Sequence, residues 1–200
     1  MASVAPSIDT AAAKTALRER IIDNRRALDA TRLAAAAREL RDVVLAMPEM
    51  AGVRSVATYV SVGSEPGTGP LLESLSERDV EVLLPILLPH GDLDWAPYAG
   101  PDGLVPAARG MLEPVTEAMG TAAVTTVDAV LAPGLAVDQR GIRLGRGGGS
   151  FDRALARVGR RVFTCVLLHD GEVLDMPVPR QAHDVPVSAA ATPSGFHRFE

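Results

Sequence analysis

Residues 131–155 read LAPGLAVDQRGIRLGRGGGSFDRAL, a stretch in which five glycines lie between Gly141 and Gly149. Each glycine costs about 0.5–1 kcal/mol relative to alanine, because it loses more backbone freedom on folding. Together they cost about 3–5 kcal/mol, which is large against the ~5–15 kcal/mol that stabilises an ordinary domain. A simple connecting loop does not need this composition, so the stretch indicates a functional site.

Glycine permits positive φ angles and close backbone approach, so that consecutive N–H groups can converge on an anion. Residues 150–158 are expected to form a helix, and the loop would deliver the anion to the N-terminus of that helix. Arg143 and Arg146 in the loop suit phosphate oxygens, whereas Asp152 in the first helical turn suits Mg²⁺. The pattern predicts a site for a nucleoside triphosphate.

Two common nucleotide-binding motifs fit this stretch poorly. A Walker loop requires Gly-Lys, which occurs nowhere in the chain. A dinucleotide fingerprint is closer, because Gly145 and Gly147 precede a helix and Asp170 lies about twenty residues further on. However, Ser150 stands where the third glycine belongs, and about a dozen residues separate the preceding strand from the glycines. The dinucleotide interpretation is therefore disfavoured.

Residues 133–155 closely resemble the signature of the 5-formyltetrahydrofolate cyclo-ligases, also called 5,10-methenyltetrahydrofolate synthetases. With x for variable positions, this chain has PGLAVDxxGxRLGRGGGSFDRAL and the family usually has PGLAFDxxGxRLGxGxGYYDRxL, a match over 23 consecutive positions. Ser150 departs from the pattern, because the family usually carries tyrosine there. Phe151 keeps the aromatic ring of the second tyrosine but lacks its hydroxyl.

The resemblance implies an enzyme that joins ATP and 5-formyltetrahydrofolate to give 5,10-methenyltetrahydrofolate, ADP and phosphate. In that reaction ATP phosphorylates the formyl oxygen, N10 of the folate attacks the activated carbon, and phosphate leaves. No protein nucleophile is required. The protein would hold the reactants in line, which can supply about 7–11 kcal/mol, and stabilise the developing charge with Mg²⁺ and arginine.

Composition narrows the class of protein. The 200 residues suit one domain, and 47% of them are hydrophobic, which is ample for a core. The net charge of −5 argues against a general nucleic-acid or anionic-membrane surface, whereas seven arginines between Arg140 and Arg161 indicate a small anionic ligand. The single cysteine, Cys165, is expected to be buried. No signal peptide or membrane span is evident, so we expect a cytoplasmic protein, taken to be a monomer.

Helices and strands are expected to alternate along the chain. The patterns predict helices over residues 10–28, 31–47, from about 70, and 150–158, and strands over 53–60, 80–88, 92–98, 127–132, 162–168 and 187–192. This order predicts a three-layer α/β domain with a mainly parallel sheet flanked by helices. The resemblance further implies the fold shared with ribose-5-phosphate isomerases and CoA-transferases. Residues 9–200 would form this one domain after a disordered segment, residues 1–8.

Lys14, Arg18 and Arg25 are expected on one face of the first helix. The simplest interpretation of such a face is solvated charge. Lys14 is, however, the only lysine among twenty basic residues. The resembled family carries a Lys-x3-Arg pair near its N-terminus that contacts the nucleotide, and Lys14 and Arg18 match that pair.

The loop after the strand at residues 53–60 is a candidate for the folate side, because open α/β sheets bind ligands at the carboxyl ends of their strands. Tyr59, Ser61 and Glu65 match a Tyr-x-Ser-x-x-x-Glu-like segment of the resembled family. The resemblance implies that Glu65 binds the folate and that Val60 lines the substrate pocket.

Three further side chains are left with two interpretations each. Trp95 could pack in the core or stack on a flat heterocycle. Glu113, in a Gly-Met-Leu-Glu-Pro segment that loosely matches a pocket-shaping element of the family, is a weak candidate. Asp138 could form a turn or contact a ligand.

The metal assignment combines two aspartates that are far apart in the chain. His183-Asp184 matches a segment resembling HDxxVDxVxT, whose first aspartate helps to bind magnesium in the family. Ser188 stands where the second acidic residue usually is. The histidines show no zinc spacing, and the chain has no Gly-x-Ser-x-Gly nucleophile elbow.

The resemblance therefore implies a full set of contacts. Arg146 and Asp152 would act in catalysis, and Asp152 with Asp184 would hold Mg²⁺. ATP would contact Lys14, Arg18, Arg143, Leu144, Gly145, Arg146, Gly147, Gly148, Gly149, Ser150 and Phe151. The folate would contact Val60, Glu65, Arg146, Gly147, Gly148, Gly149 and Ser150.

Two alternatives remain open. The chain could be a non-catalytic relative of the same fold, for example one that binds RNA, or a different kinase or ligase that acts on another acid. The acidic net charge and the intact arginine and aspartate pattern argue against the first. Glu65 argues mildly against the second.

Overall fold

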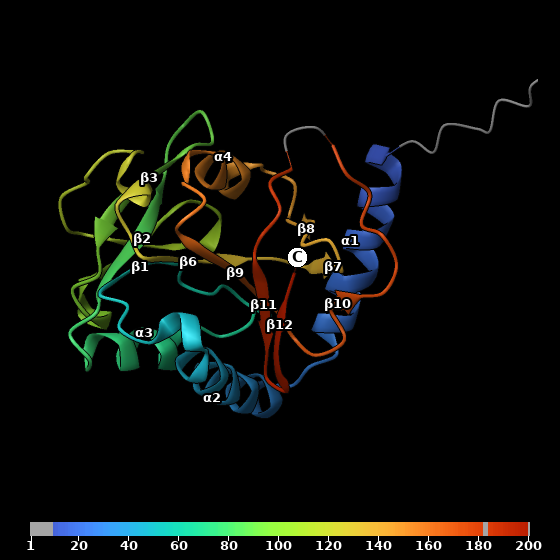
Figure 1. Ribbon diagram of the computed structural model, residues 1–200, viewed down its shortest axis with the longest axis horizontal. Coiled ribbons are helices and arrows are strands. Elements are labelled where there is room, and N and C mark those ends of the chain that lie inside the picture. Colours follow the sequence, from blue (N-terminus) through green and yellow to red (C-terminus); the bar gives the residue numbers. More distant parts are fainter. Residues whose placement is uncertain (1–9, 182–183, 200) are drawn as a thin grey trace, which may run out of the picture.

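The computed structural model, which describes residues 10–181 and 184–199, is built on a seven-stranded sheet (Figure 1). The strands lie in the order β12-β11-β9-β6-β1-β2-β3. Neighbours from β11 to β2 are parallel, whereas β12 and β3 pair antiparallel at the two edges. The mainly parallel sheet is confirmed. Its strands are β1 (Ser55–Ala57), β2 (Glu81–Leu87), β3 (Leu93–Pro97), β6 (Ala129–Pro133), β9 (Phe163–Leu167), β11 (Ala189–Thr192) and β12 (Gly195–Arg198).

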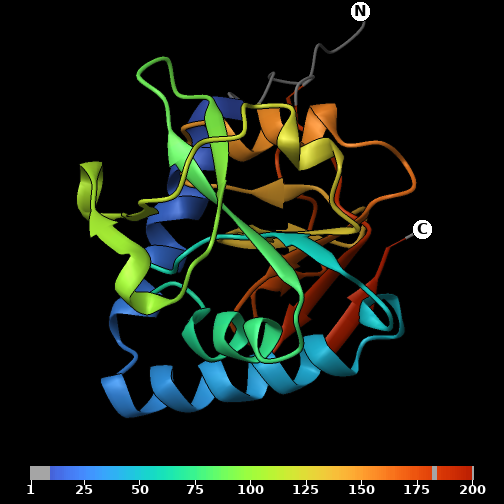
Figure 2. The same ribbon diagram turned by 90° about the vertical axis from the view of Figure 1, so that its left-hand side faces the viewer.

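Helices cover both faces of this sheet (Figures 1 and 2). α2 (Ala30–Ala46) and α3 (Gly69–Ser76) lie along one face, and α4 (Ser150–Arg157) lies on the other. α1 (Thr10–Arg26) lies beside a smaller sheet of β10, β7 and β8. The remaining elements are β4 (Leu104–Pro106), β5 (Leu112–Pro114), β7 (Ala136–Asp138), β8 (Arg143–Leu144), β10 (Val173–Leu174) and the short helices η1 (Pro48–Met50), η2 (Pro101–Gly103), η3 (Ala108–Gly110) and η4 (Ala123–Thr125).

The core follows from the two-residue period of the strands, which sends successive side chains to opposite faces of the sheet. Val56, Leu131 and Leu167 pack in one buried cluster with residues of α2 and α3. Their neighbours in sequence pack in a second cluster with residues of α4; these are Ala57, Val130 and Val166. The strands are buried on both sides, which explains why they read as continuous apolar runs.

The expected elements are present with shifted ends. α2 begins at Ala30 because Asp29 caps it, accepting a 2.8 Å hydrogen bond from the backbone N–H of Arg32. The structure also contains strands that the sequence patterns miss. β12 follows the strand that was expected to be the last, and it pairs with β11 although it is only four residues long. β4 and β5 form a hairpin inside the aperiodic region 99–126.

Two further expectations concern the ends of the chain and membranes. The segment 1–8, expected to be disordered, lies outside the described residues, as does the domain boundary at residue 9. Among the helices that the structure describes, none has the length and apolar character needed to cross a bilayer.

The parallel arrangement brings the loops that follow β1 and β6 to the same end of the sheet, the carboxyl ends of the strands. β1 leads into residues 58–65 and β6 into residues 134–135, and both strands point in the same direction. The glycine-rich loop, residues 145–149, connects β8 to the first turn of α4. Segments far apart in sequence therefore meet at the carboxyl ends of the strands, where open α/β sheets bind ligands.

Candidate active site

A cavity of about 410 Å³ opens where these loops meet, a volume typical of small-molecule sites. Leu144 is the one residue assigned to a ligand from the sequence that does not line it. Its side chain is fully buried in a small cluster with Leu135 and Ile142, so a ligand contact would have to come from its main chain. The assigned residues that line the cavity are Lys14, Arg18, Val60, Glu65, Arg143, Gly145, Arg146, Gly147, Gly148, Gly149, Ser150, Phe151, Asp152 and Asp184.

The glycine-rich loop adopts the conformation for which its composition is suited. Gly147 and Gly149 have φ angles of 105° and 67°, which residues with a Cβ rarely adopt. Gly149 precedes the first turn of α4, and no side chain caps that helix start. Arg18 donates a 2.9 Å hydrogen bond from Nε to the carbonyl of Gly145. The loop is therefore held from α1, and the start of α4 presents backbone amides toward the cavity edge.

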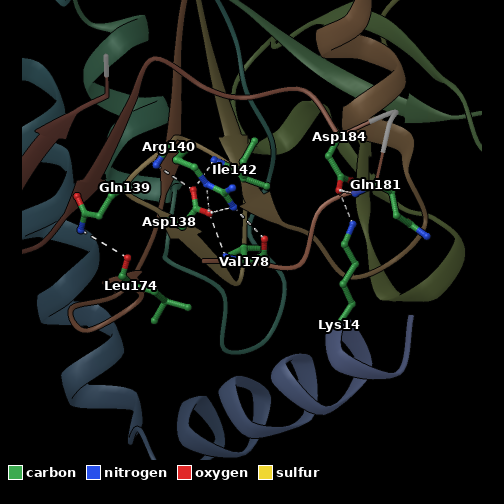
Figure 3. Close-up of polar contacts among 9 residues, drawn as sticks. All are labelled: Lys14, Asp138, Gln139, Arg140, Ile142, Leu174, Val178, Gln181 and Asp184. Carbon is green, nitrogen blue, oxygen red and sulfur yellow. Dashed lines mark hydrogen bonds and ion pairs between the residues drawn. The ribbon is translucent and has the colours of Figure 1, made fainter. Parts of the chain in front are cut away.

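The basic face of α1 points inward, so the interpretation as solvated charge is wrong. Lys14 is 5% exposed and Arg25 is 2% exposed. Lys14 donates from Nζ to Oδ2 of Asp184 at 2.6 Å, and the backbone N–H of Gln181 donates to the same oxygen at 2.6 Å (Figure 3). The structure thus joins a residue near the start of the chain to one near its end.

Arg143 interacts with both aspartates assigned to the metal. Its Nη2 donates to Oδ1 of Asp152 at 2.8 Å, and its Nη1 donates to the carbonyl of Pro133 at 3.1 Å. Burial lowers the pKa of Arg143, while the nearby charges of Asp152 and Asp184 partly offset that effect. Its Nε is buried without a hydrogen-bond partner among the described residues. An anion entering the cavity would meet a cation that is already desolvated.

A further ion pair lines the cavity. Arg146 donates from Nε to Oε1 of Glu65 at 2.9 Å. The other carboxylate oxygen of Glu65 accepts a 2.8 Å hydrogen bond from the backbone N–H of Val62. The side chain of Arg146 is 53% exposed and that of Glu65 is 13% exposed. The residue assigned to phosphate and the residue assigned to folate thus bind each other here.

An apolar wall completes the cavity, and sequence reasoning missed most of it. Its members come from β2, β3 and the β4–β5 hairpin: Pro85, Leu87, Leu93, Met111 and Leu112. Glu113, a weak candidate, also lines the cavity and accepts a 2.9 Å hydrogen bond from the backbone N–H of Leu87. It braces the hairpin against β2. The only sequence signal for this wall is the apolar run at residues 82–88, which equally describes a buried strand.

The aromatic residues resolve one open question. Trp95 is fully buried and does not line the cavity, so it belongs to the core. It makes an edge-to-face contact with Phe151, whose ring centroid is 6.1 Å away. Phe151 makes a second such contact with Tyr59 at 6.5 Å. Phe151 therefore lines the cavity while its ring is held in place by contacts with two buried aromatic residues.

A buried ion pair beneath the cavity was also missed. Arg25 donates from Nε and Nη2 to the two carboxylate oxygens of Glu172, each at 2.7 Å, and from Nη2 to the carbonyl of Gly134 at 2.7 Å. Glu172 also accepts from the backbone N–H of His169, whose ring lies 3.1 Å from the carbonyl of Ser64. Gly134 lines the cavity and Ser64 precedes Glu65. This network anchors α1 to both sides of the site.

Three other side chains have structural surroundings. Asp138 forms a turn, as one of its two interpretations held, by accepting hydrogen bonds from the backbone of Arg140 and Ile142. Cys165 is fully buried, as expected, and burial raises the pKa of its thiol far above the usual value. Ser188, at the position that is usually acidic, lies 3.1 Å from the hydroxyl of Thr164.

The donor set is compatible with a magnesium ion that arrives with a nucleotide. No group of three or more His, Cys, Asp or Glu residues within 10–181 and 184–199 could hold a metal by itself. Asp152 and Asp184 both line the cavity and both act electrostatically on Arg143. Two carboxylates completed by phosphate oxygens and water form the environment that Mg²⁺ prefers.

Comparisons with known proteins agree on one family. The family model described as "5-formyltetrahydrofolate cyclo-ligase family" matches residues 10–193. A 5-formyltetrahydrofolate cyclo-ligase of Mycolicibacterium smegmatis is 35% identical over 185 residues, covering 90% of this chain and 93% of the relative. The enzyme of the same name from Escherichia coli K12 is 30% identical, covering 76% and 84%.

Solved structures agree with the sequence relatives. The NMR structure of Aquifex aeolicus 5,10-methenyltetrahydrofolate synthetase matches with a TM-score of 0.79 and 26% identity, covering 94% of this chain and 93% of that one. A 5,10-methenyltetrahydrofolate synthetase from Mycoplasma pneumoniae matches with a TM-score of 0.71 at 17% identity, which bears on the fold alone; 90% and 98% of the two chains are covered.

Proposed function

Because the chain belongs to the 5-formyltetrahydrofolate cyclo-ligase family, we propose that the cavity at the carboxyl ends of β1 and β6 is its active site. The chain is an ATP-dependent ligase that converts 5-formyltetrahydrofolate to 5,10-methenyltetrahydrofolate. The observation that carries the proposed site is that every residue assigned to a ligand except Leu144 lines one cavity, although these residues span the chain from Lys14 to Asp184.

The chemistry defines what the site must do. A formyl oxygen is a poor leaving group, and transfer of the γ-phosphoryl group of ATP to that oxygen converts it into phosphate. N10 then forms a bond to the activated carbon and gives up its proton, and the bond from that carbon to oxygen breaks as phosphate departs. The protein contributes by holding the formyl oxygen in line with the γ-phosphorus and by stabilising charge on the transferring group.

The glycine-rich loop and its cations would hold the triphosphate. The amides at the start of α4 face the cavity edge, and Arg143 offers a buried Nε without a partner among the described residues. Arg146 would leave Glu65 to bind the phosphates. Lys14 would contact the nucleotide from α1, while Arg18 would keep the loop in place through Gly145. These are charge-assisted contacts, the strongest class of hydrogen bond.

Asp152 and Asp184 would hold Mg²⁺ together with the phosphate oxygens. Each carboxylate is balanced here by a cation, Arg143 for Asp152 and Lys14 for Asp184. A bound Mg²⁺ would supply further positive charge beside the phosphates. On binding, each charged side chain would exchange one oppositely charged partner for another. The phosphates would bind Arg143 and Lys14, and Mg²⁺ would bind Asp152 and Asp184.

The opposite side of the cavity would bind the folate. Glu65 offers a carboxylate that can accept hydrogen bonds from the pterin, and Val60, Pro85 and Leu87 provide an apolar surface beside it. Ser150 replaces the ring that the family usually has, which leaves Phe151 as the aromatic residue at the boundary between the two ligands.

Further properties of the chain stay predictions. We place the fold with the ribose-5-phosphate isomerases and CoA-transferases, with residues 9–200 as one domain. A monomer in the cytoplasm that uses Mg-ATP, without a nucleic-acid or membrane partner, is the expected state. The RNA-binding or otherwise non-catalytic alternative is not favoured, since the named relatives are cyclo-ligases.

One assay tests the function and the metal assignment. The purified chain is mixed with 5-formyltetrahydrofolate, ATP and Mg²⁺, and the near-ultraviolet absorbance of the methenyl product is recorded together with phosphate release. Asp152→Asn should abolish turnover without unfolding the chain, and an unchanged rate would remove Asp152 from the site. ATP hydrolysis without methenyl product would indicate another acid as substrate, and neither product would indicate a non-catalytic relative.

A further inference from the structure

One fully built carboxylate site lies outside the cavity and has no role in the proposed chemistry. Asp138, at the end of β7, is 1% exposed and does not line the cavity. Its Oδ1 accepts hydrogen bonds from the backbone N–H groups of Arg140 at 2.9 Å and Ile142 at 3.0 Å. Its Oδ2 accepts from the backbone N–H of Val178 at 3.0 Å and from Nη2 of Arg140 at 2.6 Å (Figure 3).

These contacts join two segments that are far apart in sequence. The turn at residues 138–142 leads directly into β8, which carries Arg143. Val178 belongs to the segment whose Gln181 donates its backbone N–H to Asp184. Arg140 strengthens the junction by donating from Nη2 to the carbonyl of Val178 at 3.3 Å. One buried carboxylate thus holds the backbone just before Arg143 and the backbone of the segment that leads to Asp184.

The same turn also holds the chain on the far side of Asp184. The backbone N–H of Val187 donates to the carbonyl of Gly141 at 2.9 Å, and the N–H of Gly141 donates to the carbonyl of Asp138 at 2.9 Å. Gly141 has a φ of 73°, and a Cβ there would lie 2.3 Å from the carbonyl oxygen of Val187. Val178 and Val187 are therefore both attached to one turn, and Asp184 lies between them.

We propose that Asp138 is a positioning residue that sets Asp184, and through it Lys14, in the geometry that binds the metal–nucleotide complex. The inference rests on the proposed function of the cavity. Asp138 touches no ligand in this scheme. It acts through the turn 138–142, which fixes both attachments of the segment that carries Asp184. Groups hydrogen-bonded directly to a metal ligand typically change metal affinity by about 10–100-fold when they are mutated. Asp138 acts on Asp184 through the backbone of residues 178–181, and we take that range as the scale of the effect.

The folate side provides an internal contrast. Glu65 is held by the backbone of Val62 and by Arg146, and neither contact involves the turn 138–142. A defect at Asp138 should therefore weaken the nucleotide and metal but spare the folate. A residue that only stabilised the fold would affect both ligands equally.

The experiment compares Asp138→Asn with Asp128→Asn. The control carboxylate, Asp128, also accepts from backbone amides, the N–H groups of Arg54 and Ser55 at 2.8 and 3.1 Å, but it is exposed and lies at the amino ends of the strands, before β6. Calorimetric titrations measure the affinity for a non-hydrolysable ATP analogue with and without Mg²⁺ and, separately, for 5-formyltetrahydrofolate. Hydrogen exchange is followed at residues 178–181 and 184–187.

The expected result is a selective defect. Asp138→Asn should weaken the Mg²⁺-dependent binding of the analogue by about 10–100-fold. It should leave the folate affinity within about twofold of the wild-type value and speed exchange at residues 178–181 and 184–187. Asp128→Asn should keep both affinities. Arg140→Met, which removes an exposed side chain, should give a smaller defect of the same kind and decides the question if Asp138→Asn does not fold.

Three outcomes would overturn the proposal. Nucleotide affinity equal to that of Asp128→Asn would show that Asp138 does not position the site. Equal loss of nucleotide and folate affinity in Asp138→Asn would show a purely structural role. If Asp138→Asn does not fold, an unchanged nucleotide affinity in Arg140→Met would show the same. Failure of the wild-type chain to bind the analogue in a Mg²⁺-dependent manner would instead overturn the proposed function on which the inference rests.

Discussion

Two ion pairs that line the cavity have similar geometry but different surroundings. Lys14 and Asp184 lie 2.6 Å apart with side chains 6% and 5% exposed. Arg146 and Glu65 lie 2.9 Å apart, and their side chains are 53% and 13% exposed. Loss of one partner from a buried pair typically costs about 3–5 kcal/mol, whereas a solvent-exposed pair contributes about 0–1 kcal/mol. The Lys14–Asp184 pair is thus preformed, whereas the Arg146–Glu65 pair can rearrange at little cost.

The difference indicates how the site can bind two ligands. The buried pair keeps its two charges in place until phosphate and metal offer each of them a replacement. The exposed pair can open readily, because water already solvates much of Arg146. We infer that rearrangement on binding is concentrated at Glu65 and Arg146. The following predictions test this contrast.

Lys14→Met should have the largest effect. It removes the ammonium beside a buried carboxylate, and we expect a loss of about 3–5 kcal/mol in the free energy of unfolding. Affinity for the nucleotide should fall at least about 100-fold. Urea unfolding and calorimetric titration measure the two quantities. Arg26→Met on the same helix, where the side chain is 72% exposed, should change the free energy of unfolding by less than about 0.5 kcal/mol. Equal stability of the two variants would refute the buried pair.

Glu65→Gln should separate binding from stability. An amide has one acceptor oxygen where the carboxylate has two, so it cannot accept the same two hydrogen bonds from the pterin, and the KM for folate should rise about 10–100-fold. The free energy of unfolding should change by less than about 1 kcal/mol, since the Arg146 pair is exposed. Steady-state kinetics at saturating ATP give the KM. Glu49→Gln, which breaks the distant pair with Arg198, is the control and should leave the KM unchanged. If Glu65→Gln lost as much stability as Lys14→Met, the two ion pairs would not differ as proposed.

Acid should weaken the turn at residues 138–142. Burial alone would raise the pKa of Asp138, but the hydrogen bonds from Arg140, Ile142 and Val178 outweigh it and hold the pKa below its usual value. A lowered pKa contributes stability above the pKa of the unfolded chain, about 3.9, and this stability is lost as the pH falls through the folded value. Unfolding measured from pH 6 to about pH 2 should therefore show a steeper loss for wild type than for Asp138→Asn. Parallel curves would exclude this contribution.

Arg146→Met should have the smallest effect on stability. The free energy of unfolding should change by less than about 1 kcal/mol, and the change should shrink further in 1 M salt, because exposed charges are screened. Denaturant unfolding at two salt concentrations measures both effects. A salt-independent loss above about 3 kcal/mol would show that this pair behaves like a buried one.

The cavity lining around the glycine-rich loop could be assigned from the sequence more fully than the apolar wall, for a physical reason. Most contacts of the nucleotide side lie in one continuous loop, whose glycines and arginines are unusual in themselves. Asp184 and Lys14 are distant in sequence, and the resemblance to a family identified them, whereas periodicity only placed Lys14 on a charged face. The sequence patterns gave no sign that this face is buried.

The apolar wall shows what local patterns cannot reveal. Pro85 and Leu93 reach the cavity because β2 and β3 pair antiparallel, and that register depends on contacts between strands. Each residue alone is an ordinary strand residue. β12 was missed because its four residues lack a repeating pattern, and pairing with β11 stabilises it. The sheet itself was predictable, since its buried strands are long apolar runs.

The contact between Lys14 and Asp184 joins residues 170 positions apart, and this has a consequence for biosynthesis. Chains emerge from the ribosome N-terminus first, and their domains fold as units. The first helix therefore leaves the ribosome long before its acidic partner is translated. A nascent polypeptide cannot assemble this pair until residue 184 has left the ribosome, so nucleotide binding that depends on the pair should not precede that point.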